Sequence, residues 1–241
     1  MIRFENLHKA FGDKQVLAGL TLEVQDGETM VVIGYSGTGK SVALKHIVGL
    51  LDPDAGDVLV DGRAVSTLDR DALNALRREI GYVFQFAALF DSLTVAENVA
   101  LGLRRRGLDD DEIAERVTEA LALVDLTGAG ERYAAELSGG MRKRVGIARA
   151  IALRPRYILY DEPTTGLDPV TSAVIDRLMV RTREHLGVTG VVVTHDMRSA
   201  YTVGDRIAML HEGRIRQVGT VAEVQETDDP VVRQFIEGRP T

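Results

Sequence analysis

The chain has 241 residues, no cysteine and a formal net charge of −7 at pH 7. This length can bury a sizeable core, and a domain that carries inserted subdomains is favoured over one undivided domain. Without cysteine the chain forms neither disulfides nor thiolate metal sites, which suits a reducing compartment. The negative charge argues against a nucleic-acid-binding face spread over the molecule, so no nucleic-acid partner is expected. No apolar run has the length of a membrane span, and residues 1–5 lack the character of a signal peptide, so a cytosolic location is expected.

The first quarter of the chain shows strand patterns around one glycine-rich loop. Residues 2–24 alternate between apolar and polar side chains, which predicts half-buried antiparallel strands. Residues 29–33 predict a short strand, and apolar residues at helical spacing over 42–51 predict a helix. Residues 54–57 are expected to form a turn, and 58–60 a strand that closes in a hairpin. Together these pieces predict a small antiparallel β-subdomain beside the loop.

Helical patterns dominate the middle of the chain, and buried strands return after it. In chain order the patterns predict a helix over 69–78, a strand over 80–84 ending at Gln85, helices from 94 to 152, a strand over 157–160, a helix near 172–185, a strand over 190–194 and a hairpin of 207–210 with 214–218. The continuous apolar strands are typical of a parallel sheet covered on both faces. The predicted division is a core with the β-subdomain over 1–86 and 155–219, a helical subdomain over 87–154 and a tail over 220–241.

The loop over Gly34–Ser41 fits the phosphate-binding pattern of two fixed glycines followed by lysine and a hydroxyl residue. Glycines at 34, 37 and 39 allow positive φ and a close approach of backbone amides to phosphate oxygens. Lys40 would contact the β- and γ-phosphates, and the Ser41 hydroxyl would ligate Mg²⁺. The alternative is a glycine-rich turn with a surface lysine, which the strand before the loop and the helix after it disfavour.

Two further segments narrow the chemistry. The apolar strand ending in Asp161 and Glu162 could hold Mg²⁺ through the first carboxylate and polarise a water molecule through the second. Two acids that merely end a strand are the alternative. Ser138 followed by two glycines predicts a second helix start suited to phosphate, against the simpler interpretation of Ser138 as an ordinary N-cap. The combination favours hydrolysis of a nucleoside triphosphate.

With these motifs in place, essentially the whole chain resembles the ATP-binding cassette (ABC) family, because Leu137–Met141 is similar to that family's signature motif. The resemblance implies an α/β fold, namely a P-loop NTPase (RecA-like) core with an antiparallel β-subdomain and an inserted α-helical subdomain. It also implies a head-to-tail homodimer in which each ATP lies between the glycine-rich loop of one subunit and the signature helix of the other. Met141, where glutamine is usual, and Tyr35, where proline is frequent, depart from the commonest pattern.

The resemblance also assigns roles to single residues. Gln85 corresponds to the glutamine loop, Asp168 to the loop that crosses the dimer, and His195 to the switch histidine, while Phe11 would stack on adenine. As alternatives, Phe11 is a core aromatic, His195 a capping or core histidine and Gln85 a surface amide. The implied ATP contacts are Phe11, Gly34, Tyr35, Ser36, Gly37, Thr38, Gly39, Lys40, Ser41, Val42, Gln85, Ser138, Gly139, Gly140 and Asp168. The implied Mg²⁺ ligands are Ser41, Gln85 and Asp161. The implied catalytic residues are Glu162 and His195.

Three segments are similar to the ATPase subunits of Mla- and Mce-associated lipid transporters: 34–37, 84–99 and the tail over 229–235. This similarity implies phospholipid or another hydrophobic cargo, an integral-membrane permease, a Mce-domain substrate-binding protein and a small regulatory subunit. The chain would then lie peripherally on the cytoplasmic face of the inner membrane. The apolar cluster Phe86, Leu89 and Phe90 would receive the permease, or would form the core of the helical insertion.

One alternative remains from the motifs, and a second is disfavoured. A cassette protein that transports nothing, but regulates a membrane or division complex, would carry the same ATP motifs. A small-molecule kinase gives no reason to keep the 137–141 segment.

The charged stretch with arginines at 104–106 and aspartates at 109–111 predicts a solvated loop whose aspartates cap the next helix, rather than a binding patch.

Overall fold

The structure is a computed structural model that describes residues 1–239. These residues form two compact units, one made of residues 1–77 together with the chain from 189 onward, the other of residues 78–188. The last two residues of the predicted tail, Pro240 and Thr241, lie outside the described residues. Within residues 1–239 no helix combines the length and apolar character needed to cross a membrane.

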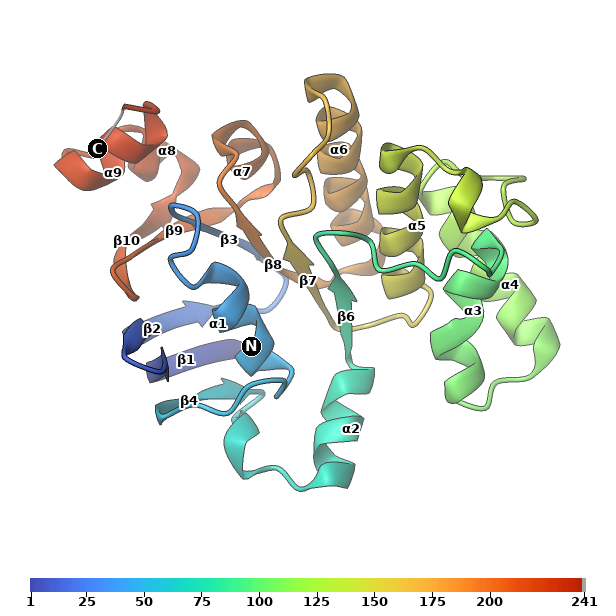
Figure 1. The fold of residues 1–241 in the computed structure, drawn as a ribbon, viewed down its shortest axis with the longest axis horizontal. Coiled ribbons are helices and arrows are strands. Elements are labelled where there is room, and N and C mark those ends of the chain that lie inside the picture. Colours follow the sequence, from blue (N-terminus) through green and yellow to red (C-terminus); the bar gives the residue numbers. More distant parts are fainter. Residues whose placement is uncertain (240–241) are drawn as a thin grey trace. The chain divides into compact units, whose positions relative to one another are not determined.

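The first unit contains an antiparallel sheet, drawn in blue tones in Figure 1. Its strands follow the order β2-β1-β4-β5 and are β1 (Ile2–Phe11), β2 (Lys14–Val24), β4 (Ala55–Val60) and β5 (Arg63–Ala64). The alternating pattern of residues 2–24 correctly predicted the antiparallel pairing of β1 with β2, since Ile2 and Phe4 are buried on one face. The hairpin of β4 with β5 is likewise confirmed.

The predicted turn at 54–57 is wrong, because β4 already begins at Ala55. Gly56 has φ +73°, and a Cβ added there would lie 2.1 Å from the carbonyl oxygen of Asn6. The register between β1 and β4 shifts across this glycine, between the pairs Glu5–Asp57 and His8–Ala55. Residues typical of a turn therefore serve a bulge inside a strand, where only glycine permits the close approach of the two backbones.

A second group of strands in this unit follows the order β10-β9-β3-β8. They are β3 (Thr29–Ile33), β8 (Thr189–Thr194), β9 (Arg206–His211) and β10 (Arg214–Thr220). β3 pairs in parallel with both β8 and β9, while β9 and β10 form the predicted antiparallel hairpin. Every residue of β3 and β8 is buried, which confirms that continuous apolar runs mark the parallel strands.

The helices of the first unit are α1 (Lys40–Ile47), α2 (Arg70–Arg78), α7 (Met197–Val203), α8 (Val221–Gln225) and α9 (Pro230–Ile236). The first two were predicted. The short helix α7 was not, although Asp196 caps it by accepting hydrogen bonds from two backbone amides. The described part of the tail, residues 220–239, contains α8 and α9, which follow β10 in the red part of Figure 1.

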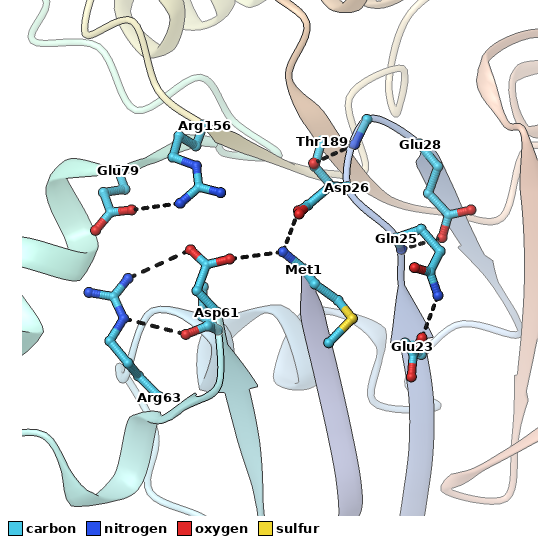
Figure 2. Close-up of polar contacts among 12 residues, drawn as sticks. Met1, Glu23, Gln25, Asp26, Glu28, Asp61, Arg63, Glu79, Arg156 and Thr189 are labelled. Atoms are coloured by element: carbon cyan, nitrogen blue, oxygen red, sulfur yellow. Dashed lines mark hydrogen bonds and ion pairs between the residues drawn. The ribbon is translucent and has the colours of Figure 1, made fainter.

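One polar cluster connects the start of β1 with the turns that follow β2 and β4 (Figure 2). The Met1 amine donates to Asp26, in the turn after β2, and at 3.0 Å to Asp61, in the turn after β4. Arg63 reaches the same Asp61 carboxylate at 3.8 Å. Exposed ion pairs of this kind contribute little to stability, so the buried face of the sheet carries most of it.

The second unit combines two strands with four helices. β6 (Ile80–Val83) and β7 (Tyr157–Asp161) pair in parallel, and the helices are α3 (Val95–Arg105), α4 (Asp110–Leu123), α5 (Gly139–Ile151) and α6 (Pro169–Leu186). Strand β6 ends one residue earlier than predicted. Helix α3 begins with a complete capping box between Thr94 and Glu97, which explains why the helical pattern starts there.

The charged stretch after α3 has the predicted cap but not the predicted loop. The Asp109 side chain accepts a hydrogen bond from the Glu112 amide at 2.8 Å and caps α4. Arg104 and Arg105, however, belong to the last turn of α3, where positive charge is favourable beside the free carbonyl groups. Arg106 donates to the Leu153 carbonyl at 2.8 Å, so these cations serve the fold.

Candidate functional site

The glycine-rich loop connects β3 to α1 in the first unit, as predicted. Gly34, Gly37 and Gly39 have φ values of +155°, +77° and +103°. A Cβ on Gly34 would lie 2.5 Å from the Leu210 carbonyl oxygen, and one on Gly39 would lie 2.9 Å from Val16 Cγ1. Glycine is therefore favoured at all three positions by the backbone conformation, and at Gly34 and Gly39 also by close packing.

Lys40 lies inside this loop and is only 5 % exposed. Its ammonium donates to the carbonyl oxygens of Gly34 at 2.8 Å and Tyr35 at 3.1 Å. The Thr38 hydroxyl donates to the same Tyr35 oxygen at 2.9 Å. Because Lys40 also begins α1, positive charge and the amino end of a helix coincide, which suits an anion.

Phe11 and His195 both belong to the first unit, and neither is a core residue. Phe11 is 48 % exposed at the end of β1, with Lys9 Nζ 5.7 Å from its ring centroid. His195 is exposed directly after β8, and the next residue, Asp196, caps α7. The alternatives that placed these two side chains in the core are therefore wrong, and both are accessible.

In the second unit, Asp161 ends β7 as a buried carboxylate. Tyr82, on the neighbouring strand β6, donates its hydroxyl to Asp161 Oδ2 at 3.1 Å. Burial, and next the charge of Asp161, raise the pKa of Tyr82 far above its ordinary value. The phenol therefore stays protonated and acts as a donor that orients the carboxylate, a role that the sequence did not indicate.

Glu162, the next residue, is buried and has φ +49°. A positive φ is uncommon for a residue with a side chain and costs conformational free energy. The Thr165 hydroxyl donates to Glu162 Oε2 at 3.1 Å, so the carboxylate is also held in place. Backbone strain and a fixed carboxylate together are typical of a functional position.

Lys143, on α5, was missed by the sequence analysis although it contacts two predicted site residues. It is 6 % exposed, and its ammonium donates to the carbonyl oxygens of Gln85 and, at 3.3 Å, Glu162. Burial lowers the pKa of Lys143, while the carboxylates of Glu162 and Asp161 oppose this shift. The available signal was a lysine on the same helical face as buried Ile147, four residues on.

Arg149, further along α5, holds the segment that follows Gln85. It donates to the carbonyl oxygens of Ala88 at 2.7 Å and Ala87 at 2.6 Å, and these two alanines have φ values of +48° and +54°. Burial lowers the pKa of its guanidinium. Helix α5 thus uses buried Lys143 and half-buried Arg149 to fix irregular backbone after β6.

The same segment presents aromatic side chains to solvent. Phe86 is 84 % exposed and Phe90 58 % exposed, whereas Leu89 is half-buried. The alternative that these residues form the core of the helical insertion is therefore wrong for both phenylalanines. Two large apolar side chains are therefore exposed within one short segment.

The signature-like segment opens α5. Ser138 caps this helix by accepting the Met141 amide at 3.3 Å. Gly140 allows close packing, since a Cβ there would lie 2.5 Å from Thr171 Cγ2 on α6. Ser138 and the two glycines line a hollow of about 420 Å³ together with Leu167 and Asp168.

Asp168 also caps α6, accepting the amides of Val170 at 2.9 Å and Thr171 at 3.0 Å. Hydrogen bonds from the Thr171 hydroxyl and then its amide lower the pKa of Asp168. Within the second unit, the structure therefore brings Asp168 and Ser138–Gly140 to one hollow. In the same unit, Gln85 and Glu162 both contact Lys143.

The predicted Mg²⁺ ligands suit that ion by their chemistry. Ser41, Gln85 and Asp161 offer hydroxyl, amide and carboxylate oxygens, the donors that Mg²⁺ prefers. No group of three or more His, Cys, Asp or Glu side chains suited to a metal occurs among residues 1–239.

Residues 17–165 of the chain match the family model of the ABC transporters. The chain therefore belongs to the ABC transporter family. It is an ATPase of this family, the ATP-binding subunit of a transporter that powers a membrane permease. The fold is likewise that of the ABC ATPases.

Individual relatives agree with this family. The methionine import ATP-binding protein MetN of Xylella fastidiosa is 42 % identical over 98 % of this chain and 72 % of its own length. The chloroplastic protein Trigalactosyldiacylglycerol 3 of Arabidopsis thaliana is 41 % identical over 99 % of this chain and 74 % of its own length. A dimeric ATP-binding cassette solved in a post-hydrolysis state with ADP and Pi is 36 % identical, covers 92 % of this chain and 99 % of that one, and has a TM-score of 0.83.

The contacts of Lys143 predict a selective defect when its charge is removed. Lys143→Met keeps the length of the side chain but removes the donor to the Gln85 carbonyl, at a cost of about 1–3 kcal/mol, whereas the Glu162 carbonyl still accepts the Thr165 amide at 3.3 Å. We expect the kcat for ATP hydrolysis to fall about tenfold or more because Gln85 and Glu162 lose a common anchor, while ATP affinity changes less than about twofold. Steady-state hydrolysis and calorimetry measure the two quantities.

Arg154→Met is the matched control, since its ion pair with Glu119 is exposed on both sides. It should leave both quantities unchanged. A Lys143→Met protein with normal kcat would show that the buried ammonium only supports the fold.

Proposed function

We propose that this chain hydrolyses ATP as a head-to-tail homodimer on the cytoplasmic face of the inner membrane and drives a permease that moves lipid. The observation that carries the dimer is the presence of two separate phosphate-suited helix starts, at Lys40 and at Ser138. The similarity to a cassette solved as a dimer supports it. Each ATP would be bound by the first helix start of one subunit and the second of its partner.

The residues of one site would divide the work. The loop amides and Lys40 bind the phosphates, Phe11 stacks on the adenine, and Glu162 polarises the attacking water. Thr165 and Tyr82 keep the two carboxylates oriented. Mg²⁺, held by Ser41, Gln85 and Asp161, would offset phosphate charge when bound. Accessible His195 would contact the γ-phosphate.

The permease would dock on the surface formed by Phe86 and Phe90. Both rings are exposed, and the backbone between Gln85 and Phe90 is fixed by Lys143 and Arg149. Large apolar side chains on a rigid segment are suitable anchors for a partner helix. Because Lys143 also contacts Glu162, movement of the docked partner could reach the hydrolytic carboxylate through one side chain.

Lipid is the cargo that three features support. The glycine-rich loop with Tyr35, the segment 84–99 and the tail over 229–235 are similar to lipid-transporter ATPases, and one relative bears the name of a glycolipid. The methionine importer is equally similar, which is expected because cargo contacts belong to the permease. This ATPase therefore supports lipid as the cargo only through its resemblance to the ATPase subunits of lipid transporters.

The cargo is tested by recovering the partners and reconstituting them. The affinity-tagged chain is purified from detergent-solubilised membranes of its own cell, and its partners are identified by mass spectrometry. We expect a permease, together with a Mce-domain protein and a small regulatory subunit. Recovery of a division complex without a permease would favour the regulatory alternative.

The recovered complex is then placed in proteoliposomes with fluorescent phospholipid or labelled methionine. ATP-dependent movement of phospholipid is expected, and a complex carrying Glu162→Gln serves as the inactive control. Movement of methionine and not of phospholipid would contradict the lipid assignment while leaving the ATPase intact.

A further inference from the structure

The C-terminal helix contacts the glycine-rich loop through one aromatic pair. The ring centroids of Tyr35 and Phe235 lie 4.9 Å apart and the ring planes meet at 85°, an edge-to-face arrangement. Such a pair contributes more favourable free energy than the burial of its apolar area alone would give. Two segments from opposite ends of the chain, both similar to lipid-transporter ATPases, therefore meet within the first unit.

Tyr35 is the residue on which the hydrogen bonds inside the loop converge. Its carbonyl oxygen accepts the Thr38 amide at 3.4 Å, the Thr38 hydroxyl at 2.9 Å and the Lys40 ammonium at 3.1 Å. The orientation of the Tyr35 carbonyl group thus affects the positions of the Thr38 and Lys40 side chains. The ring and the carbonyl belong to one residue, so a shift of the ring that moves the Tyr35 backbone also displaces the carbonyl.

Packing, and not a hydrogen bond, holds the Tyr35 ring. Its hydroxyl is buried and has no hydrogen-bond partner among residues 1–239. A buried hydroxyl without a partner costs free energy, so the ring stays in this position only because its apolar contacts compensate. Phe235 is the aromatic side chain that supplies such a contact.

The helix that carries Phe235 is anchored by other residues. Asp229 caps α9 and forms an ion pair with Arg216 of β10 at 2.8 Å. Val232 is fully buried, and Arg233 Nε donates to the Thr227 carbonyl at 3.0 Å. Phe235 is therefore presented from a fixed support, and its loss need not release the helix.

We propose that Phe235 is a positioning residue of the nucleotide site. Its ring holds Tyr35, and the Tyr35 carbonyl in turn holds Thr38 and Lys40 in the arrangement that receives phosphate. The proposal rests on the assignment of the 34–41 loop to ATP, and it gives the C-terminal tail a role in nucleotide affinity. Phe235 itself touches no reacting group.

The test is the ATP affinity of Phe235→Ala in the full chain. Loss of the aromatic pair should weaken binding roughly three- to tenfold by calorimetry, with kcat at saturating ATP unchanged. Phe235→Tyr keeps the ring and should restore the affinity. Ile236→Ala is the control on the same helix, and should lower the unfolding temperature without changing ATP affinity.

A double-mutant cycle separates direct from indirect action. In a Tyr35→Leu background, Phe235→Ala should weaken binding no further. The same loss with and without Tyr35 would overturn the proposal, and so would an unchanged affinity with a lower unfolding temperature. Lys40→Ala is measured beside these variants, because an unchanged affinity there would remove the loop assignment itself rather than the role of Phe235.

Discussion

Glu162→Gln should stop ATP turnover while preserving the ATP-bound dimer. Removing a general base typically lowers the rate about 10²- to 10⁴-fold, and we expect kcat to fall within that range. Glutamine has the shape of glutamate and can still accept the hydrogen bond from Thr165, so the strained backbone at this residue should be retained. ATP binding should therefore persist, and hydrolysis should not.

Two measurements on the same protein check this result. Steady-state phosphate release gives the rate, and size-exclusion chromatography with ATP and Mg²⁺ shows whether a dimer accumulates. Glu119→Gln is the control, because it removes an exposed carboxylate in the same unit. Normal phosphate release by Glu162→Gln would mean that another group polarises the water.

Lys40→Ala should abolish most of the ATP affinity. A hydrogen bond to a charged group contributes about 1.5–3 kcal/mol, which corresponds to a loss of roughly 10- to 150-fold. The variant also leaves the Gly34 and Tyr35 carbonyl groups without this donor, so the loop itself should loosen. Both effects weaken phosphate binding.

Calorimetry with ATP measures the loss, and thermal unfolding without nucleotide verifies that the protein is folded. Lys45→Ala removes an exposed lysine from the same helix and should bind ATP normally. If Lys40→Ala bound ATP as tightly as the unchanged chain, the 34–41 loop would not be the phosphate site.

Local patterns predicted the parts of this molecule that depend on nearby residues. Alternation over residues 2–24 gave the antiparallel pair, and the continuous apolar run at 190–194 gave a buried parallel strand. The glycines at 34, 37 and 39 have the positive φ that the loop pattern requires. These features follow from residue type and spacing along the chain.

Contacts between distant segments could not be predicted in this way. Lys143 reaches Gln85, 58 residues away, and nothing in either segment alone identifies its partner. Glutamate and alanine rarely adopt a positive φ, so the residue types of Glu162, Ala87 and Ala88 do not predict the backbone conformation found there. The bulge at Gly56 was mistaken for a turn because both use the same residues.

The pairing of Tyr35 with Phe235 shows the same limit. Each lies in a segment that the sequence similarity singles out, but nothing in either segment alone predicts that the two rings meet. The ion pair between Asp229, which caps α9, and Arg216 of β10 helps to hold the helix from which Phe235 meets Tyr35. Such tertiary packing determines which residues support the site.

The hydrolytic unit is tested most directly by the ATPase activity per subunit on dilution. The chain without its permease is assayed at saturating ATP and Mg²⁺, from micromolar to nanomolar protein. If the helix starts at Lys40 and Ser138 are halves of sites shared by two subunits, activity per subunit must fall steeply as the dimer dissociates. Activity per subunit that stayed constant down to a verified monomer would contradict the shared site.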